Sequence, residues 1–442
     1  MSDWLYMTAG DLGRGIGAGE IDAQALTETY LEAISGHSAR DRIYSAVTAE
    51  RARAEAAAAG ARAKAGQRLG PLDGVPISWK DLFDSAGVAT EAGSALLKGR
   101  VPGRDADVLR NATAAGLVCL GKTHMSELAF SGLGLNPVTA TPPCVNDAEA
   151  VPGGSSSGAA ASVAFGLAAC GIGSDTGGSV RIPSAWNDLV GLKTTSGRVS
   201  LGGVVPLCAR FDTVGPLSRS VEDCALILAA LEGGKAADLR GASLKGVRLA
   251  ALQTVVMDDV RDAPLAGYRS AVERLQAAGA IVDKLDAPEV AEAMPLSGIL
   301  FTAEAYGTWG DVIEASPDKM FAHILERFRS GRDFKASDYV AAWQRLDALR
   351  ADWNARVAGY DAVIMPSAPI LPPDARRLME DEDYYLTENL LALRNTRVGN
   401  LMGLCAVNLP TGVPSCGIML CGKPTQEERL LRVASAAEEA LS

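Results

Sequence analysis

Along this chain, segments with apolar residues at helical spacing alternate with short, continuous apolar runs. Residues 22–34 have apolar residues at helical spacing, and residues 49–66 are rich in alanine and arginine, so residues 10–66 are predicted to be helical. Short apolar runs predict strands ahead of Lys80 and, further along, at 116–123, 280–286, 361–370 and 417–422. Amphipathic stretches at 264–280 and 427–441 predict helices. This alternation is typical of an α/β fold with a mixed sheet between helices.

One long segment fits neither period. Residues 137–158 are rich in proline, asparagine, glycine and serine. Loops of this length inside a folded chain often have a function. We therefore expect part of a site here.

Composition and charge narrow the class of protein. Of the 442 residues 48% are hydrophobic and 21% charged, which is enough to build a sizeable core. A net charge of −11 argues against binding to nucleic acid or to an anionic membrane. No apolar run reaches the ~18 residues of a membrane span, and no signal peptide is recognisable, so we expect a cytoplasmic protein. The eight cysteines form no CxxC pair and the three histidines have no metal-site spacing, so neither disulfides nor a zinc site is expected.

Three short segments carry candidate chemistry. Lys80 ends an apolar run, residues 153–158 form a serine cluster between glycines, and residues 173–179 form a second glycine-rich loop that ends in serine. A glycine pair before a serine lets backbone N–H groups point at one place. Such a loop can bind an oxyanion beside a serine hydroxyl.

Two familiar motifs are also matched, but their contexts disagree with the usual function. Residues 116–123 match a nucleotide-binding phosphate loop, yet the residues between its glycines are Leu-Val-Cys-Leu, which favour a strand. Residues 154–158 match the nucleophile elbow GxSxG, yet Pro152 is unsuited to a central strand and His323 is the sole later histidine. We interpret neither as a nucleotide or an α/β-hydrolase site.

The run from Pro152 to Asp223 resembles the signature region of the amidase signature family over about 70 residues. The KD pair that ends Pro76–Asp81, the GKT strand and the MPSAP loop at 365–369 fit the same family. The resemblance implies the amidase signature fold, a central mixed twisted β-sheet sandwiched between α-helices. It implies a single domain over 1–442, which we divide into an N-terminal helical layer (1–66), a core signature region (about 71–225), a peripheral region (235–360) and a return to the core (361–442).

The same resemblance implies a Ser–cisSer–Lys triad. Carried onto this sequence, Ser179 is the nucleophile, Ser155 the bridging serine and Lys80 the base, with separations of 75 and 24 residues. That spacing selects Ser155 over Ser156 and Ser157. The resemblance also implies a cis peptide bond before Ser155.

The chemistry of such a triad depends on burial. A serine hydroxyl needs a base, and a lysine acts as a base only when burial lowers its pKa from ~10.4. The apolar residues around Lys80 favour such a lowering of its pKa. The expected oxyanion donors are the backbone N–H groups of Thr176, Gly177, Gly178 and Ser179. Asp175 and Arg181 are interpreted as a scaffolding pair, with Arg181 as a clamp for a substrate carboxylate as the alternative. Neither a metal nor an organic cofactor is needed.

The substrate is less well defined by the sequence. The apolar residues Leu128, Phe130, Leu133 and Leu135 after the GKT strand predict one wall of an acyl pocket, with core packing as the alternative. Residues 366–373 and 384–402 predict the second wall, and from both walls we select Leu128, Phe130, Leu133 and Pro366 as pocket residues. We therefore expect a serine amidohydrolase for small or aryl amides that forms an acyl-enzyme, with carbamates or urethanes as further substrates and ester cleavage as a side activity. We expect small molecules as its binding partners, and a monomer or homodimer as its oligomeric state. The alternative is the glutaminase (A) subunit of a tRNA-dependent amidotransferase. A degenerate binding protein is disfavoured because all three triad positions are present.

Overall fold

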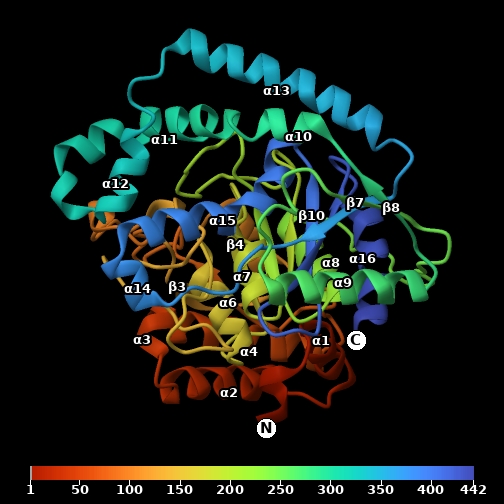
Figure 1. The fold of residues 1–442 in the computed structure, drawn as a ribbon. Helices are drawn as coiled ribbons and strands as arrows, with labels where there is room; N and C mark the ends of the chain where they lie inside the picture. The colour runs from red at the N-terminus through yellow and green to blue at the C-terminus, as the bar shows by residue number, and fades with distance from the viewer. Residues whose placement is uncertain (1) are drawn as a thin grey trace.

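An eleven-stranded mixed sheet forms the centre of the computed structural model, which describes residues 2–442 (Figure 1). The strand order is β1-β3-β2-β4-β6-β5-β10-β11-β9-β7-β8. β2 pairs in parallel with β3 and β4, β7 pairs in parallel with β8 and β9, and the other neighbours are antiparallel. The predicted α/β fold with a mixed sheet is confirmed. The strands are β1 (Tyr44–Val47), β2 (Pro76–Lys80), β3 (Val118–Thr123), β4 (Cys170–Ser174), β5 (Val190–Lys193), β6 (Val214–Ser218), β7 (Arg248–Leu252), β8 (Ile281–Leu285), β9 (Ala362–Pro366), β10 (Cys405–Pro410) and β11 (Gly417–Gly422).

Helices near the N-terminus form a layer along the bottom of Figure 1. They are η1 (Ser2–Tyr6), α1 (Ala9–Ala18), α2 (Ala23–Gly36), α3 (Arg40–Ile43) and α4 (Ala49–Lys64). The side chain of Asp22 starts α2 by accepting hydrogen bonds from the backbone N–H groups of Gln24 and Ala25 (2.9 and 3.1 Å). The prediction of helix throughout 10–66 is wrong at one place, because residues 44–47 form the edge strand β1 beside β3.

The remaining helices cover the sheet. α16 contacts both α8 and α9, and all three helices contact the strands, whereas α6 and α7 pack on the strands from another layer that also includes α15. α10, α11, α12 and α13 lie together at the top of Figure 1. The bounds are η2 (Ala95–Leu97), α5 (Asp107–Ala114), η3 (Glu127–Ala129), α6 (Ser157–Ala164), α7 (Arg181–Trp186), α8 (Val221–Glu232), α9 (Asp262–Ala277), α10 (Pro288–Ala293), α11 (Leu296–Ala315), η4 (Pro317–Lys319), α12 (Ala322–Arg329), α13 (Ala336–Arg356), α14 (Ala375–Glu380), α15 (Glu382–Leu401) and α16 (Glu427–Leu441).

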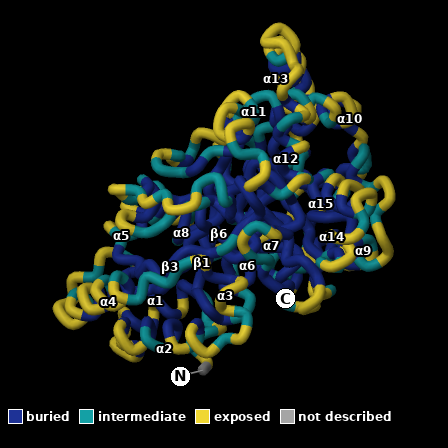
Figure 2. The backbone as a smooth tube through the Cα atoms, turned by 90° about the vertical axis from the view of Figure 1, so that its left-hand side faces the viewer, coloured by how far each residue is buried: buried dark blue, intermediate teal, exposed yellow. Residues whose placement is uncertain are grey.

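The middle strands are buried on both faces. Every residue of β2, β3, β4, β5 and β6 is buried, which explains why these strands appear in the sequence as continuous runs instead of alternating ones. Figure 2 shows buried backbone filling the middle of the molecule and exposed backbone on α2, α4 and the end of α13. Within residues 2–442, no helix combines the length and the apolar character needed to cross a bilayer.

The glycine- and serine-rich segment lies between η3 and α6 and is held by specific contacts. The side-chain amide of Asn136 donates to the carbonyls of Gly93 and Met125 (2.8 Å each). The backbone N–H of Gly154 donates to the carbonyl of Gly132 (2.8 Å). The backbone N–H of Ser174, at the end of β4, donates to the Ser156 hydroxyl (3.3 Å), which holds the serine cluster against that strand.

Candidate active site

Lys80 is the last residue of β2 and its side chain is fully buried. Its Nζ lies 2.7 Å from Oγ of Ser155 and 2.8 Å from Oγ of Ser174. Since β2 and β4 are parallel and Trp79 is opposite Ile172, Lys80 and Ser174 leave the sheet at the same edge. Ser174 was not predicted as a site residue, although its position within the loop 173–179 was a usable signal.

The environment of the Lys80 amine lowers its pKa toward neutral pH. Among residues 2–442, no carboxylate lies within 4.0 Å of its Nζ. Burial lowers the pKa of Lys80 to about 7, against the opposing effect of the charges on Asp175 and Asp212. A lysine in this state can accept a proton near neutral pH.

Ser155 follows a cis peptide bond from Gly154, as the resemblance implied. A Cβ atom at Gly154 would come within 2.6 Å of the backbone nitrogen of Gly134 and of the Ser126 hydroxyl, so only glycine fits there. The neighbouring serines use their hydroxyls elsewhere: Ser156 donates to the carbonyl of Ser174 (3.2 Å) and Ser157 to that of His124 (3.3 Å). Ser155 is thus the member of the cluster whose hydroxyl contacts Lys80.

Ser179 lies beside this cluster, at the start of the turn into α7. Its carbonyl accepts a hydrogen bond from the backbone N–H of Ser156 (3.2 Å), which joins the two glycine-rich loops. Ser179, Thr176 and Gly177 line one end of a cavity. The three predicted triad residues therefore converge on one region, at the carboxyl ends of two parallel strands.

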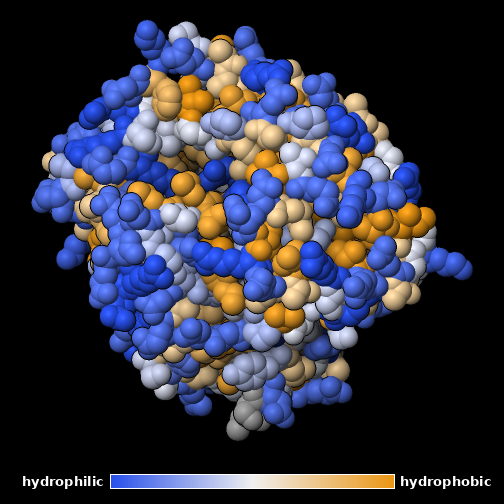
Figure 3. Space-filling model, in the orientation of Figure 1, coloured by the Kyte–Doolittle hydropathy of each residue, from blue (hydrophilic) through white to orange (hydrophobic). Residues whose placement is uncertain are grey.

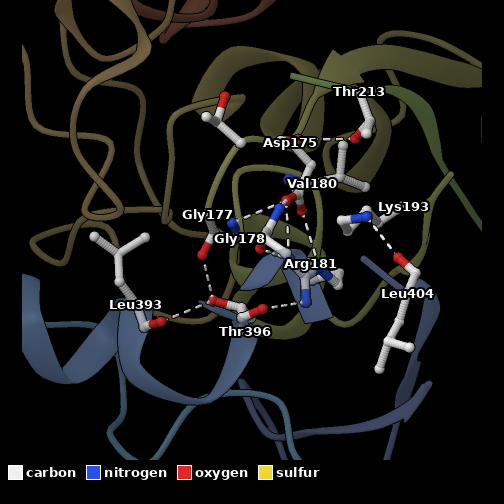
Figure 4. Close-up of polar contacts among 12 residues, drawn as sticks. Asp175, Gly177, Gly178, Val180, Arg181, Lys193, Thr213, Leu393, Thr396 and Leu404 are labelled. Carbon is white, nitrogen blue, oxygen red and sulfur yellow. Dashed lines mark hydrogen bonds and ion pairs between the residues drawn. The ribbon is translucent and has the colours of Figure 1, made fainter. Parts of the chain in front are cut away.

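Asp175 and Arg181 shape the loop between them (Figure 4). The carboxylate of Asp175 accepts hydrogen bonds from the backbone N–H groups of Gly178 (2.9 Å) and Val180 (3.1 Å), and it pairs with the Arg181 guanidinium at 2.9 Å. Arg181 also donates to the carbonyl of Thr396 (2.6 Å). The guanidinium and its neighbours hold the pKa of the Asp175 carboxyl well below its usual range.

Arg181 is enclosed by protein groups. Its side chain is fully buried and its nitrogens contact Asp175, Asn400 and the Thr396 carbonyl. It lines neither of the two cavities near Ser179 described below.

The loop presents fewer oxyanion donors than predicted. The N–H of Gly178 is occupied by Asp175. The backbone N–H groups of Thr176, Gly177 and Ser179 have no acceptor among residues 2–442. Gly178 has a φ of 143°, and a Cβ there would lie 2.2 Å from Oγ1 of Thr396, so the loop requires glycine at this position.

Two adjoining cavities lead to Ser179. The inner one has a volume of about 20 Å³, and the outer one, of about 550 Å³, lies between α11, α12 and α15. Figure 3 shows this face of the molecule hollowed below the helices at its top. Both cavities are lined by Phe130, Phe301, Arg327 and Arg397.

The predicted acyl-pocket residues divide into two groups. Phe130 lines both cavities. Leu128 packs in the main core, Leu133 packs in a second apolar cluster with Trp186, and Pro366 ends β9, where its carbonyl accepts a hydrogen bond from Asn395 (2.9 Å). The wall that the sequence did not predict comes from α11 and α12, whose approach to the site is a property of the tertiary structure.

The chain is similar to known proteins over nearly its whole length. The family model described as Amidase matches residues 25–431. The 2-amino-5-chloromuconic acid deaminase of Comamonas testosteroni is 34% identical over 95% of this chain and 93% of its own length. The A subunit of the glutamyl-tRNA(Gln) amidotransferase of Moorella thermoacetica is 32% identical over 98% and 96%. The native peptide amidase of Stenotrophomonas maltophilia superposes with a TM-score of 0.83 at 27% identity, covering all of this chain and 98% of that one.

Proposed function

The chain belongs to the amidase family, and from that premise we propose that it is a serine amidohydrolase that cleaves the C–N bond of small amides through an acyl-enzyme on Ser179. One observation carries the proposal. The buried amine of Lys80, whose pKa is about 7, lies 2.7 Å from the hydroxyl of Ser155 in the serine cluster that contacts the Ser179 loop.

The proposed reaction begins with two proton transfers. Neutral Lys80 takes the proton of the Ser155 hydroxyl, and Ser155 takes that of Ser179 as Oγ of Ser179 attacks the amide carbon. The carbonyl oxygen becomes an oxyanion, which the backbone N–H groups of Thr176, Gly177 and Ser179 bind. One such donor is typically worth about 3–4 kcal/mol in the transition state.

The second half releases the products. The C–N bond breaks as Ser155 gives a proton to the leaving nitrogen, Lys80 returns its proton to Ser155, and the acyl group stays on Ser179. Water then loses a proton to the same relay and attacks the ester carbon, which frees the acid and restores the serine. Every proton in these steps is thus exchanged among Lys80, Ser155, Ser179, the substrate and water.

The substrate range proposed is small or aryl amides, with carbamates as further candidates. Aromatic residues at the cavities, Phe130 and Phe301, support an acyl group with an apolar part. A relative whose name describes the deamination of a small organic acid supports C–N cleavage on a compact substrate.

Amine release by the purified chain tests the proposal. We expect turnover of at least one class in a panel of primary amides, anilides, carbamates and glutamine, and we expect Ser179→Ala to lower kcat by at least 10³-fold. Ser157→Ala is the matched control, because its hydroxyl contacts only the His124 carbonyl, and it should stay within about threefold of wild type. Residual activity above a few per cent in Ser179→Ala would refute the nucleophile assignment.

The glutaminase component of a tRNA-dependent amidotransferase is the second candidate. The observation that favours it is the 32% identity to a protein of that name over nearly the whole chain. The same panel separates the two: vigorous turnover of other amides by the chain alone supports the autonomous hydrolase. Slow cleavage of glutamine alone, stimulated by a partner protein, would favour the amidotransferase component.

A further inference from the structure

A buried carboxylate, that of Asp212, lies beside the glycine-rich loop of residues 173–179. β6 pairs antiparallel with β4, and the pairing continues beyond β4, where the backbone N–H of Asp175 donates to the carbonyl of Thr213 (2.9 Å) and Thr213 donates back (3.1 Å). This pairing brings Thr176 opposite Asp212, and the Thr176 hydroxyl donates to the Asp212 carboxylate. Since Thr176 lines the inner cavity, Asp212 is one hydrogen bond away from the cavity wall.

Neutral donors alone hold the carboxylate of Asp212. Its second oxygen accepts from the backbone N–H groups of Leu207 (3.0 Å) and Cys208 (3.2 Å). Within the described residues 2–442, no lysine or arginine nitrogen lies within 4.0 Å of it. Burial raises the pKa of Asp212, and the charge on Glu304 of α11 acts in the same direction, whereas the three hydrogen bonds act against both. The hydrogen bonds fix the position of this negative charge without cancelling it.

The other buried carboxylate of the site, that of Asp175, is already balanced by cations. It pairs with the Arg181 guanidinium at 2.9 Å. Lys193 lies in the same buried region, where its amine donates to the Leu404 carbonyl (2.6 Å), and its charge also lowers the pKa of Asp175 (Figure 4). Asp175 and Asp212 therefore differ in that Asp212 has no cationic partner among the described residues.

Lys80 is the group that gains a charge in the proposed reaction. When it takes the proton of Ser155, an ammonium forms in a fully buried position whose close partners are hydroxyl groups. Burial disfavours this ammonium and lowers the pKa of Lys80 to about 7, and the charges on Asp175 and Asp212 act in the opposite direction. Because Asp175 is already paired, Asp212 is the anion left to compensate the new ammonium.

We propose that Asp212 is a positioning residue of the proton relay: its negative charge stabilises the ammonium that forms on Lys80, and the hydrogen bond from Thr176 keeps that charge beside the site. Asp212 itself neither gains nor loses a proton, since the proton of Ser155 ends on Lys80. In the low dielectric of a buried site, charges interact beyond contact distance, so no direct ion pair is required. The inference rests on the proposed function for the proton transfer, and on the hydrogen bonds of Asp212 for the placement of the charge.

Asp212→Asn tests the proposal because it removes the charge and nearly keeps the shape. The new amide oxygen can accept from the N–H groups of Leu207 and Cys208, and the Thr176 hydroxyl can accept from the new amide nitrogen. Losing a negative charge disfavours the ammonium, so the inflection of log kcat/KM should move from pH 7 to lower pH by at least about 0.5 unit. Above about pH 8, where Lys80 is neutral in both proteins, kcat should still fall at least about tenfold.

A second variant and a matched control keep this test decisive. Asp212→Ser removes the same charge with a smaller side chain, so a packing defect of one variant is not shared by both. The control is Asp223→Asn, because Asp223 is also buried, accepts from the backbone N–H of Gly10 (2.8 Å) and lines neither cavity. It should keep the inflection and a kcat within about threefold of wild type. Circular dichroism and thermal unfolding identify any variant that fails to fold. An unchanged inflection in both Asp212 variants would overturn the proposal.

A titration without turnover separates this inference from the proposed function. The charge of Lys80 is followed by NMR in protein labelled with ¹³C at the lysine Cε atoms, with Lys80→Met to assign the resonance. We expect Asp212→Asn to lower the pKa of Lys80 by at least about 0.5 unit. Such a shift in a protein that hydrolyses none of the panel would uphold the electrostatic role of Asp212 and refute the hydrolase. Turnover that depends on Ser179, with the same Lys80 pKa in wild type and Asp212→Asn, would uphold the hydrolase and refute the role of Asp212.

Discussion

Lys80 combines complete burial with two hydroxyl partners and no counter-ion among the described residues. Burial penalises the ammonium form, and nothing nearby compensates for that penalty fully, so its pKa is about 7. By contrast, Lys122, on the neighbouring strand β3, is equally buried but lies 3.0 Å from Asp81. Two buried lysines, one strand apart, are thus in different electrostatic environments, and only Lys80 is suited to be a base.

The pH dependence of turnover follows from that difference. Lys80 must be neutral to act, so log kcat/KM should rise with a slope of about one below pH 7 and level off above it. Burial also raises the pKa of Glu127 to about 7, so Glu127→Gln is the control and should keep the same inflection. Lys80→Met should lower kcat by about 10²–10⁴-fold. A wild-type profile that is flat from pH 5 to 9 would contradict the lysine base.

At the scale of elements, the parallel pair β2 and β4 brings the site residues together. Their carboxyl ends meet at one edge, where Lys80 and Ser174 point at the serine cluster. The second wall depends on α12, which is attached through Glu127. That carboxylate accepts hydrogen bonds from the backbone N–H of Phe321, ahead of α12 (2.9 Å), and from the hydroxyl of Ser94 (2.7 Å).

Removing this attachment should loosen α12. Glu127→Ala leaves two partly or fully buried donors without an acceptor, which we expect to lower the free energy of unfolding by about 1–3 kcal/mol in urea titrations. Hydrogen exchange should accelerate in residues 321–330. Glu326→Ala, on the exposed side of α12, is the control and should change stability by less than about 0.5 kcal/mol. No acceleration at α12 in Glu127→Ala would show that other contacts hold the helix.

Helices and strands with a clear hydrophobic pattern were predicted well from the sequence. An element that forms only by pairing with a distant strand was predicted poorly. The capped helix after Asp22 and the strand at 417–422 were predicted close to their observed bounds. β1 was missed because its four residues lie among strong helix formers and become a strand by pairing with β3. Lys80, Ser155 and Ser179 were predicted from the resemblance of their local motifs to a known family, and the structure places them in one region. The stretch 384–402, predicted to line the pocket, does reach the cavities through Leu393 and Arg397. Arg327 was not predicted, because it is one arginine among many on an ordinary helix and only the packing of α12 brings it to the cavities.

At the scale of the whole molecule, the order of strands in space departs from their order in the chain. The late strands β10, β11 and β9 lie between β5 and β7 in the middle of the sheet. Each part of the sheet therefore depends on distant segments for its hydrogen bonds and its apolar contacts.

Such interleaving predicts that the chain unfolds as a unit. We expect one coincident transition in denaturant when followed by circular dichroism and by tryptophan fluorescence. Trp79 and Trp186 report on the region near the triad residues, and Trp343 and Trp353 report on α13, so Trp→Phe pairs allow each region to be followed separately. Two well-separated midpoints would indicate that the α10–α13 region is an independent domain.

The hydrogen bonds from Gly178 and Val180 to Asp175 have a further consequence for the proposed reaction. They are made inside the protein, and the Arg181 ion pair holds their acceptor in place. The dipoles around the developing negative charge are then already oriented, so little reorganisation is needed when the transition state forms. The loop is ordered when the chain folds, so the binding energy of the substrate is not needed to order it and can lower the activation barrier.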